Sequence, residues 1–231
     1  FMSRLDIYNS LFYRDVCGTT TDDRSLADYF FGKEYYDDAL ALYLSVIKSV
    51  SDDAELHEKA GYCYQKAGEY EKALDKYTMA SIIDPKTWTL RKIGLCLRKL
   101  NRNHEALNIY LRALKSEPDD LTSILMTAHC YLDTGKYEEA LKYYFRIEYQ
   151  NPGNVKVLRP IAWCYLMTGK YNEAERYFER LAEAGLTPHD MINMGHLALC
   201  QANPRKASEY YINALESGKM TVETFMNIFN D

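Results

Sequence analysis

The sequence predicts an all-α fold built from a tandem array of helix pairs, because three features recur with one period. Alanine recurs at steps of 33 or 34 residues: Ala39, Ala73, Ala106, Ala140, Ala174 and Ala207. An aromatic residue follows each alanine by four positions: Tyr43, Tyr77, Tyr110, Tyr144, Phe178 and Tyr211. A small residue precedes each alanine by twelve positions: Ala27, Gly61, Gly94, Ala128, Ala162 and Gly195. Self-similarity at such a period is typical of helical-repeat solenoids.

Each unit contains two helix-length segments, in which apolar residues recur at the spacings of three and four that mark one helical face. Gly68, Gly135 and Gly169 are predicted to end the first helix of their units, because glycine adopts the left-handed conformation common at helix C-termini. Three prolines are predicted to end the second helix: Pro85, Pro118 and Pro152. Since one helix pair cannot bury its apolar face alone, neighbouring pairs are expected to stack over a shared core.

The segment from Gly61 to Leu74, which closes on Asp84-Pro85, resembles the tetratricopeptide repeat, as do Ala128–Leu141 and Ala162–Ala174. The resemblance covers residues 20–220. It implies a right-handed α-α superhelix, a solenoid of antiparallel helix pairs whose first helices line a concave groove for peptides or partner proteins. The six repeats are expected at residues 20–53, 54–86, 87–120, 121–154, 155–187 and 188–220.

Three units depart from the pattern at the turn between their helices, where Glu34, Asn101 and Ala202 replace the usual glycine. These turns are expected to be looser or differently bent. Pro160 lies inside the apolar stretch Val155–Met167. Because proline breaks a helix interior, the first helix of the fifth repeat is expected to start near Leu158 or Arg159, or to bend there.

Both ends of the chain differ from the repeats. Residues 1–19 are expected to form an N-terminal amphipathic helix and a loop, and the opening Phe1-Met2 favours a cloning remnant or an internal cut over a native start. Residues 221–231 are expected to begin a further repeat that is cut before its second helix. The alternative for this segment is a terminal capping helix, which repeat arrays often need for solubility.

Composition narrows the classes of partner. The net charge of −5 and the isoelectric point of about 5.6 favour neither nucleic acid nor an anionic membrane. The apolar runs fall short of the ~20 residues that cross a bilayer. Repeat proteins that recognise RNA do so with a few side chains of each repeat. Such recognition needs polar residues at the same groove positions of every repeat, and here these positions vary from repeat to repeat.

Four cysteines also follow the repeat, ten positions before its alanine: Cys63, Cys96, Cys130 and Cys164. Packed helices lie about 8–10 Å apart, which is too far for disulfides between equivalent positions. Because no Cys-x-x-Cys spacing occurs, the sequence predicts no metal site, and these thiols are expected to act as small buried hydrophobes. Free thiols in this number favour a reducing compartment, so a cytoplasmic location is expected.

The sequence predicts neither an enzyme nor a cofactor. It lacks a phosphate-binding loop, a Gly-x-Ser-x-Gly elbow and a His-Glu-x-x-His helix. His129 and Cys130 are adjacent in one predicted helix, and adjacent helical residues do not face one another. No catalytic pair is therefore expected.

By the resemblance, three columns of residues face the groove, at 15, 11 and 8 positions before each repeated alanine. The candidate partner-binding residues are Tyr62, Lys66, Arg91, Leu95, Arg98, Lys99, Leu125, His129, Leu132, Arg159, Trp163, Leu166, Met167, Ile192, His196 and Leu199. This groove is predicted to be basic in repeats 2–3 and apolar or aromatic in repeats 4–6. Exposed apolar patches mark interaction sites, and Trp and Arg often carry binding energy. The strongest candidates are therefore Trp163, Arg91, Arg98 and Arg159.

The Lys–Asn clamp with which chaperone-tail binders of this family hold a terminal carboxylate is expected to be absent, because only Asn193 stands in its asparagine columns. A run of basic residues could still bind acidic peptides, because arginine forks suit carboxylates: Arg91, Lys92, Arg98, Lys99 and Arg102. The alternative is that this run is a solvated face of its helix. The predicted function is a scaffold that binds a protein or peptide. Two alternatives remain: a self-assembly or structural segment that forms homo-oligomers, and a regulatory or sensor arm of a multidomain protein.

Overall fold

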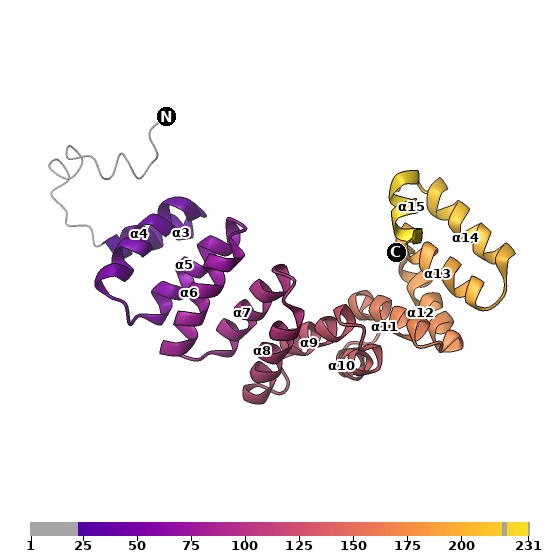
Figure 1. Cartoon of the computed structure of the whole chain (residues 1–231), viewed down its shortest axis with the longest axis horizontal. Helices are drawn as coiled ribbons and strands as arrows, with labels where there is room; N and C mark the ends of the chain where they lie inside the picture. Colours follow the sequence, from indigo (N-terminus) through magenta and orange to yellow (C-terminus); the bar gives the residue numbers. More distant parts are fainter. Residues whose placement is uncertain (1–22, 219–220, 231) are drawn as a thin grey trace. The chain divides into compact units, whose positions relative to one another are not determined.

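The computed structural model describes residues 23–218 and 221–230, and in this part of the chain it contains helices and no strands (Figure 1). The prediction of an all-α fold is therefore confirmed. The helix expected within residues 1–19 lies outside the described residues. Two compact units divide the chain between Pro118 and Asp119.

The described residues of the first unit, from Asp23 onward, form three helix pairs, and each helix packs against the next one along the chain. Its helices are α3 (Asp23–Gly32), α4 (Tyr36–Ser49), α5 (Ala54–Lys66), α6 (Tyr70–Ile83), α7 (Thr87–Lys99) and α8 (Asn103–Ser116). The side chain of Asp53 accepts hydrogen bonds from the amides of Glu55 and Leu56 at the start of α5. Such capping satisfies amide groups that the helix itself leaves without a partner.

The second unit contains three further pairs and one additional helix. Its helices are α9 (Leu121–Asp133), α10 (Tyr137–Gln150), α11 (Val155–Met167), α12 (Tyr171–Ala184), α13 (Pro188–Cys200), α14 (Pro204–Glu216) and α15 (Val222–Asn230). Thr187 and Asp190 form a reciprocal capping box at the start of α13, which fixes the helix start through two hydrogen bonds.

The repeated columns form the core of both units. All six repeated alanines are at most 1% exposed. Five of the six aromatic residues that follow them are fully buried: Tyr43, Tyr77, Tyr110, Tyr144 and Phe178. A small side chain lets the two helices of a pair approach, and the ring fills the space beside it. The period in the sequence is therefore the period of the hydrophobic core.

The turn inside each helix pair has one conformation in all six repeats. Gly68, Gly135 and Gly169 have positive φ, and so do the residues that replace glycine, Glu34 (63°) and Ala202 (57°). In every repeat, the amide of the residue after this position donates a hydrogen bond to the carbonyl five residues earlier, as from Asn203 to Ala198 at 2.8 Å. This is the Schellman arrangement.

The expectation of looser or differently bent turns at the departing repeats was wrong. Asn101 also has a positive φ, of 60°. The packing of the two helices dictates the turn, and the residue present adopts it even where its side chain opposes that conformation. A left-handed conformation costs a residue with a Cβ roughly 1–2 kcal/mol.

We expect the substitution Ala202→Gly to stabilise the second unit by about 1 kcal/mol. It relieves the strain of the left-handed conformation, and this gain exceeds the cost of the larger conformational entropy that glycine gives the unfolded chain. Thermal unfolding followed by circular dichroism measures the effect as a rise in Tm. The matched control is Gly135→Ala, whose Cβ would meet no atom within 4 Å and which should lower the Tm by a similar amount. A lower Tm for Ala202→Gly would contradict the explanation.

Pro160 lies inside α11, which begins at Val155. The expectation that this helix starts near Leu158 or Arg159 was therefore wrong, whereas the alternative of a bend at Pro160 stays a prediction. Pro160 is the sixth residue of this helix, so it cannot donate a hydrogen bond to the carbonyl of Lys156 in the first turn. The cap formed by Asn154, whose side chain accepts a hydrogen bond from the Lys156 amide at 3.1 Å, supports the helix start upstream of the proline.

The cysteine column is buried, as the sequence predicts. Burial raises the pKa of the Cys63 and Cys164 thiols to about 12 and that of Cys96 to about 11. Because the thiolate is the reactive form, these three cysteines are poor nucleophiles at neutral pH. Their position in the core explains why they follow the period of the repeat.

Candidate functional site

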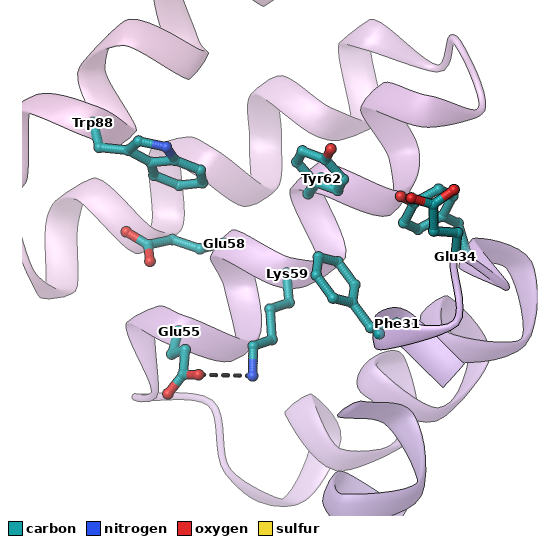
Figure 2. A pocket seen from close by; sticks show the side chains of 9 residues that line it. Phe31, Glu34, Glu55, Glu58, Lys59, Tyr62 and Trp88 are labelled. Carbon is teal, nitrogen blue, oxygen red and sulfur yellow. Dashed lines mark ion pairs between the residues drawn. The ribbon is translucent and has the colours of Figure 1, made fainter. Parts of the chain in front are cut away.

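A pocket of about 550 Å³ opens in the first unit, where α3, α5 and α7 present their side chains to one another. It is lined by Phe31, Gly32, Glu34, Tyr36, Glu55, Glu58, Lys59, Tyr62 and Trp88. Figure 2 shows the ring of Tyr62 and the side chains of Phe31 and Lys59 between Trp88 and Glu34. The first helices of three successive pairs thus contribute to one concave site.

Aromatic rings form one wall of this pocket. The ring centroids of Phe31, Tyr36 and Tyr62 lie 5.4–5.8 Å from one another, in tilted and edge-to-face contacts. Rings prefer such contacts over a face-to-face sandwich. Trp88 is 38% exposed and makes an edge-to-face contact with the buried Tyr77, at 6.0 Å between centroids. The core therefore holds the tryptophan in place while part of its ring remains open to solvent.

Two of the three carboxylates that line the pocket, Glu55 and Glu58, have partners within the protein. Glu55 forms ion pairs with Lys59 at 2.7 Å and with Arg24 at 3.0 Å, as the dashed line in Figure 2 marks for Lys59. Glu58 accepts a hydrogen bond from Thr89 at 2.5 Å, and its second oxygen lies 3.7 Å from the ammonium of Lys86. These pairs neutralise much of the negative charge on the pocket floor.

Two lysines approach the ring of Tyr62 from different helices. The ammonium of Lys66 lies 5.4 Å from the ring centroid of Tyr62 and 5.5 Å from that of Tyr36. The ammonium of Lys92 lies 5.1 Å from the Tyr62 centroid and 5.2 Å from that of Trp88. All four distances between an ammonium and a ring centroid are within the range of cation–π attraction. Positive charge therefore gathers at the aromatic side of the pocket.

Comparison with known families identifies the repeat. The family described as "Tetratricopeptide repeat" matches residues 24–86. The family described as "Anaphase-promoting complex, cyclosome, subunit 3" matches residues 99–181. The first match includes α3, α4, α5 and α6, from which most of the pocket is built. Residues 24–86 therefore match the tetratricopeptide repeat family.

Individual relatives support the same fold. The protein ycf37 of Guillardia theta is 31% identical over 105 residues, which are 43% of this chain and 59% of that protein. The match therefore spans 59% of the length of that relative, which is less than two thirds. The crystal structure of PilW, a type IV pilus biogenesis factor, superposes with a TM-score of 0.70 at 20% identity, over 89% of this chain and 96% of PilW. PilF of Pseudomonas aeruginosa gives a TM-score of 0.67 at 17% identity, over 90% and 96%.

Tetratricopeptide repeats suggest a scaffold for protein–protein interaction. Two further findings concern the described residues of this protein. None of their helices has both the length and the apolar character that a membrane span requires. They also contain no cluster of three or more His, Cys, Asp or Glu residues that could hold a metal ion.

The structure places the predicted residues of the first unit around the pocket unevenly. Tyr62 lines it, and Lys66 lies at its edge. Arg91, Leu95 and Arg98 are half-buried and Lys99 is exposed, but none of these four residues lines the pocket. The pocket-lining residues that the prediction omitted are Phe31, Gly32, Glu34, Tyr36, Glu55, Glu58, Lys59 and Trp88.

The sequence contained a usable signal for some of these residues. Phe31 and Glu58 belong to the predicted columns, but were not chosen. Trp88 precedes Leu95 by seven positions, which puts both on one face of α7. No pattern pointed to Tyr36, because it belongs to the start of the second helix of its repeat.

In the second unit, part of the predicted groove supports the fold instead. Tyr144 and His129 share a hydrogen bond of 2.7 Å, and Tyr211 and His196 share one of 3.1 Å. Burial lowers the pKa of His196, which favours the neutral ring that such a bond requires. In the fifth repeat the aromatic residue is Phe178, which has no hydroxyl group, and the matching position holds Trp163. In repeats four and six, the column eleven positions before the alanine therefore supplies the partner of the tyrosine hydroxyl, whereas Tyr77 of the second repeat donates to Gln65 instead, at 3.1 Å.

Three other predicted residues of this unit do not offer free side chains. Ile192 is 0% exposed and Leu166 is 7% exposed, so both belong to the core rather than to a groove surface. Arg159 binds Asp190 through two hydrogen bonds, of 2.5 and 2.7 Å. Met167 and Leu199 are exposed, while the remaining apolar candidates are half-buried: Leu125, Leu132 and Trp163.

Proposed function

We propose that this protein is a scaffold that binds a peptide segment of a partner protein through the first helices of its repeats. The observation that carries the proposal is the pocket of about 550 Å³ in the first unit, which three successive first helices build. Ligand sites are concave, with mostly apolar walls and a few placed polar groups. The aromatic wall and the lysines at Tyr62 supply both features.

A second binding surface is proposed on the second unit, where the sequence predicts an apolar and aromatic groove. Met167 and Leu199 are 46% and 45% exposed, and Trp163 is half-buried. Exposed apolar side chains of this kind are typical of interaction sites. Lys66, Arg91, Arg98 and Lys99 retain their proposed role as the basic part of the surface in repeats 2–3.

The proposed function is binding without catalysis. The buried cysteines with raised pKa offer no nucleophile, and His129 is bonded to Tyr144 rather than to a cysteine. Self-assembly through the same surface, or service as a regulatory arm of a longer protein, are the alternatives. A cytoplasmic location is part of the proposal, because buried reduced thiols are typical of reducing compartments.

Panning a phage library of random peptides against the purified protein tests the proposal. We expect the recovered peptides to bind the wild type and to lose at least tenfold in affinity with Tyr62→Ala, because this change removes the ring at the centre of the aromatic wall. The control is Tyr149→Ala in α10, where the tyrosine is 89% exposed and lies outside the pocket.

Three outcomes are informative. Selective loss with Tyr62→Ala supports the pocket as the binding site. Equal binding by the wild type and both variants would move the site away from it. Recovery of no peptide, together with a dimer in sedimentation equilibrium that Tyr62→Ala dissociates, would favour self-assembly.

A further inference from the structure

Two lysines at this site, Lys92 in α7 and Lys66 in α5, form no ion pair with a carboxylate among the described residues, and Lys92 is the more buried of the two. Its side chain is half-buried, and its recorded neighbours are the rings of Tyr62 and Trp88. Other lysines in the region are paired: Lys59 with Asp28 at 2.8 Å, and Lys86 with Asp84 at 2.9 Å. Removing an ammonium group from water without a counter-ion is costly, so Lys92 is placed to gain from an incoming anion.

Neighbouring charges strengthen this positive character. Arg91 and Lys66 act on Lys92 as like charges. Burial is the main cause that lowers the pKa of Lys92. The pocket carboxylates Glu55 and Glu58 interact with other cations. The third pocket carboxylate, Glu34, acts on Lys66 and Tyr36, so the charge left unbalanced between Tyr62 and Trp88 is that of Lys92.

We propose that the pocket of the first unit binds an acidic segment of a partner protein, in which a side-chain carboxylate pairs with Lys92 while an adjacent aromatic or apolar side chain enters the pocket. This inference rests on the proposed function. A side-chain carboxylate fits because Lys92 offers one point charge between two rings, whereas a chain terminus is held by several converging donors. Lys66, whose ammonium lies 5.4 Å from the same ring centroid, adds positive charge at this site.

Three matched probe peptides test the charge preference. Each is acetylated and amidated and carries one central phenylalanine, flanked by Asp and Glu in the acidic probe, by Asn and Gln in the neutral probe and by Lys in the basic probe. Binding is followed by tryptophan emission in a Trp163→Phe background, so that Trp88 is the remaining tryptophan of the two in the chain. We expect the acidic probe to bind at least tenfold more tightly than the neutral one.

Variants of the lysine locate the preference. Lys92→Gln should reduce the advantage of the acidic probe at least tenfold, and Lys92→Arg should retain most of it because the charge remains. Lys66→Gln, at an exposed position, provides a second test that does not depend on the folding of a half-buried variant. Lys115→Gln, exposed on α8, should leave the affinity unchanged.

Several results would overturn the inference. These are equal affinity for the neutral probe, tighter binding of the basic probe through the glutamates, or no binding of any probe. The inference would also fail if a neutral probe with a free C-terminus bound more tightly than the acidic probe. That result would show that the pocket binds a terminal carboxylate rather than a side-chain carboxylate. Peptides that need Tyr62 but prefer no acidic residue would refute this inference and leave the proposed function standing.

Discussion

Arg159→Met is expected to destabilise the second unit by about 3 kcal/mol, because it removes the partner of a buried carboxylate. Asp190 is 0% exposed, and it receives both hydrogen bonds of the Arg159 guanidinium across 31 residues of sequence. It also accepts hydrogen bonds from the Thr187 amide and hydroxyl groups. Met fills the space of the arginine stem but leaves the charge without its counter-ion.

Urea unfolding followed by the emission of Trp163 measures this effect, since Trp163 belongs to the same helix as Arg159. The control is Lys142→Met, which breaks an exposed pair with Glu139 and should cost well under about 1 kcal/mol. Equal midpoints for the two variants would show that the buried pair contributes little.

The loss should also depend on pH. Burial opposes the charge of Asp190, but the bonds from Arg159 and Thr187 outweigh it, so that the pKa of Asp190 is lowered. A carboxylate with a depressed folded pKa stabilises the protein above its unfolded pKa, about 3.9, and this stability is lost as the pH falls through the folded value. The difference between the wild type and Arg159→Met is therefore expected to shrink below about pH 4.

Gly94→Ala is expected to destabilise the first unit by about 1–3 kcal/mol, the usual cost of overpacking, although alanine is about 1 kcal/mol better than glycine inside a helix. A Cβ on Gly94 would lie 2.5 Å from Cζ of Tyr110. Tyr110 is 0% exposed, so its ring has little room to move. The two helices of the third repeat would have to separate.

The emission of Trp88, in the same helix as Gly94, reports the urea midpoint in a Trp163→Phe background. Gly61→Ala is the matched control, because its Cβ would lie 3.1 Å from the ring of Tyr77. A small shift of that ring would accommodate the methyl group, so we expect a much smaller loss or a gain. A higher midpoint for Gly94→Ala would show that the helix pair adjusts freely.

The architecture of this protein, helix pairs with a fixed period and a core of repeated alanines and rings, could be predicted from its amino-acid pattern alone. Such features are predictable because the helical period decides which side chains share a face, and each repeat packs against its neighbours. The burial of Ala106 and Tyr110, for example, follows from their positions in the repeat.

Which polar and aromatic side chains contact one another could be read only from the folded chain. The pair of Arg159 and Asp190, and the site where Lys92 meets Tyr62, join different helices, so each depends on the offset between the helices and on the rotamers chosen. The positive φ at Ala202 likewise comes from helix packing that overrides the preference of the residue. The spacing of residues in the sequence predicts the helix face on which a side chain lies. It does not predict the distance from that side chain to those of the neighbouring helix.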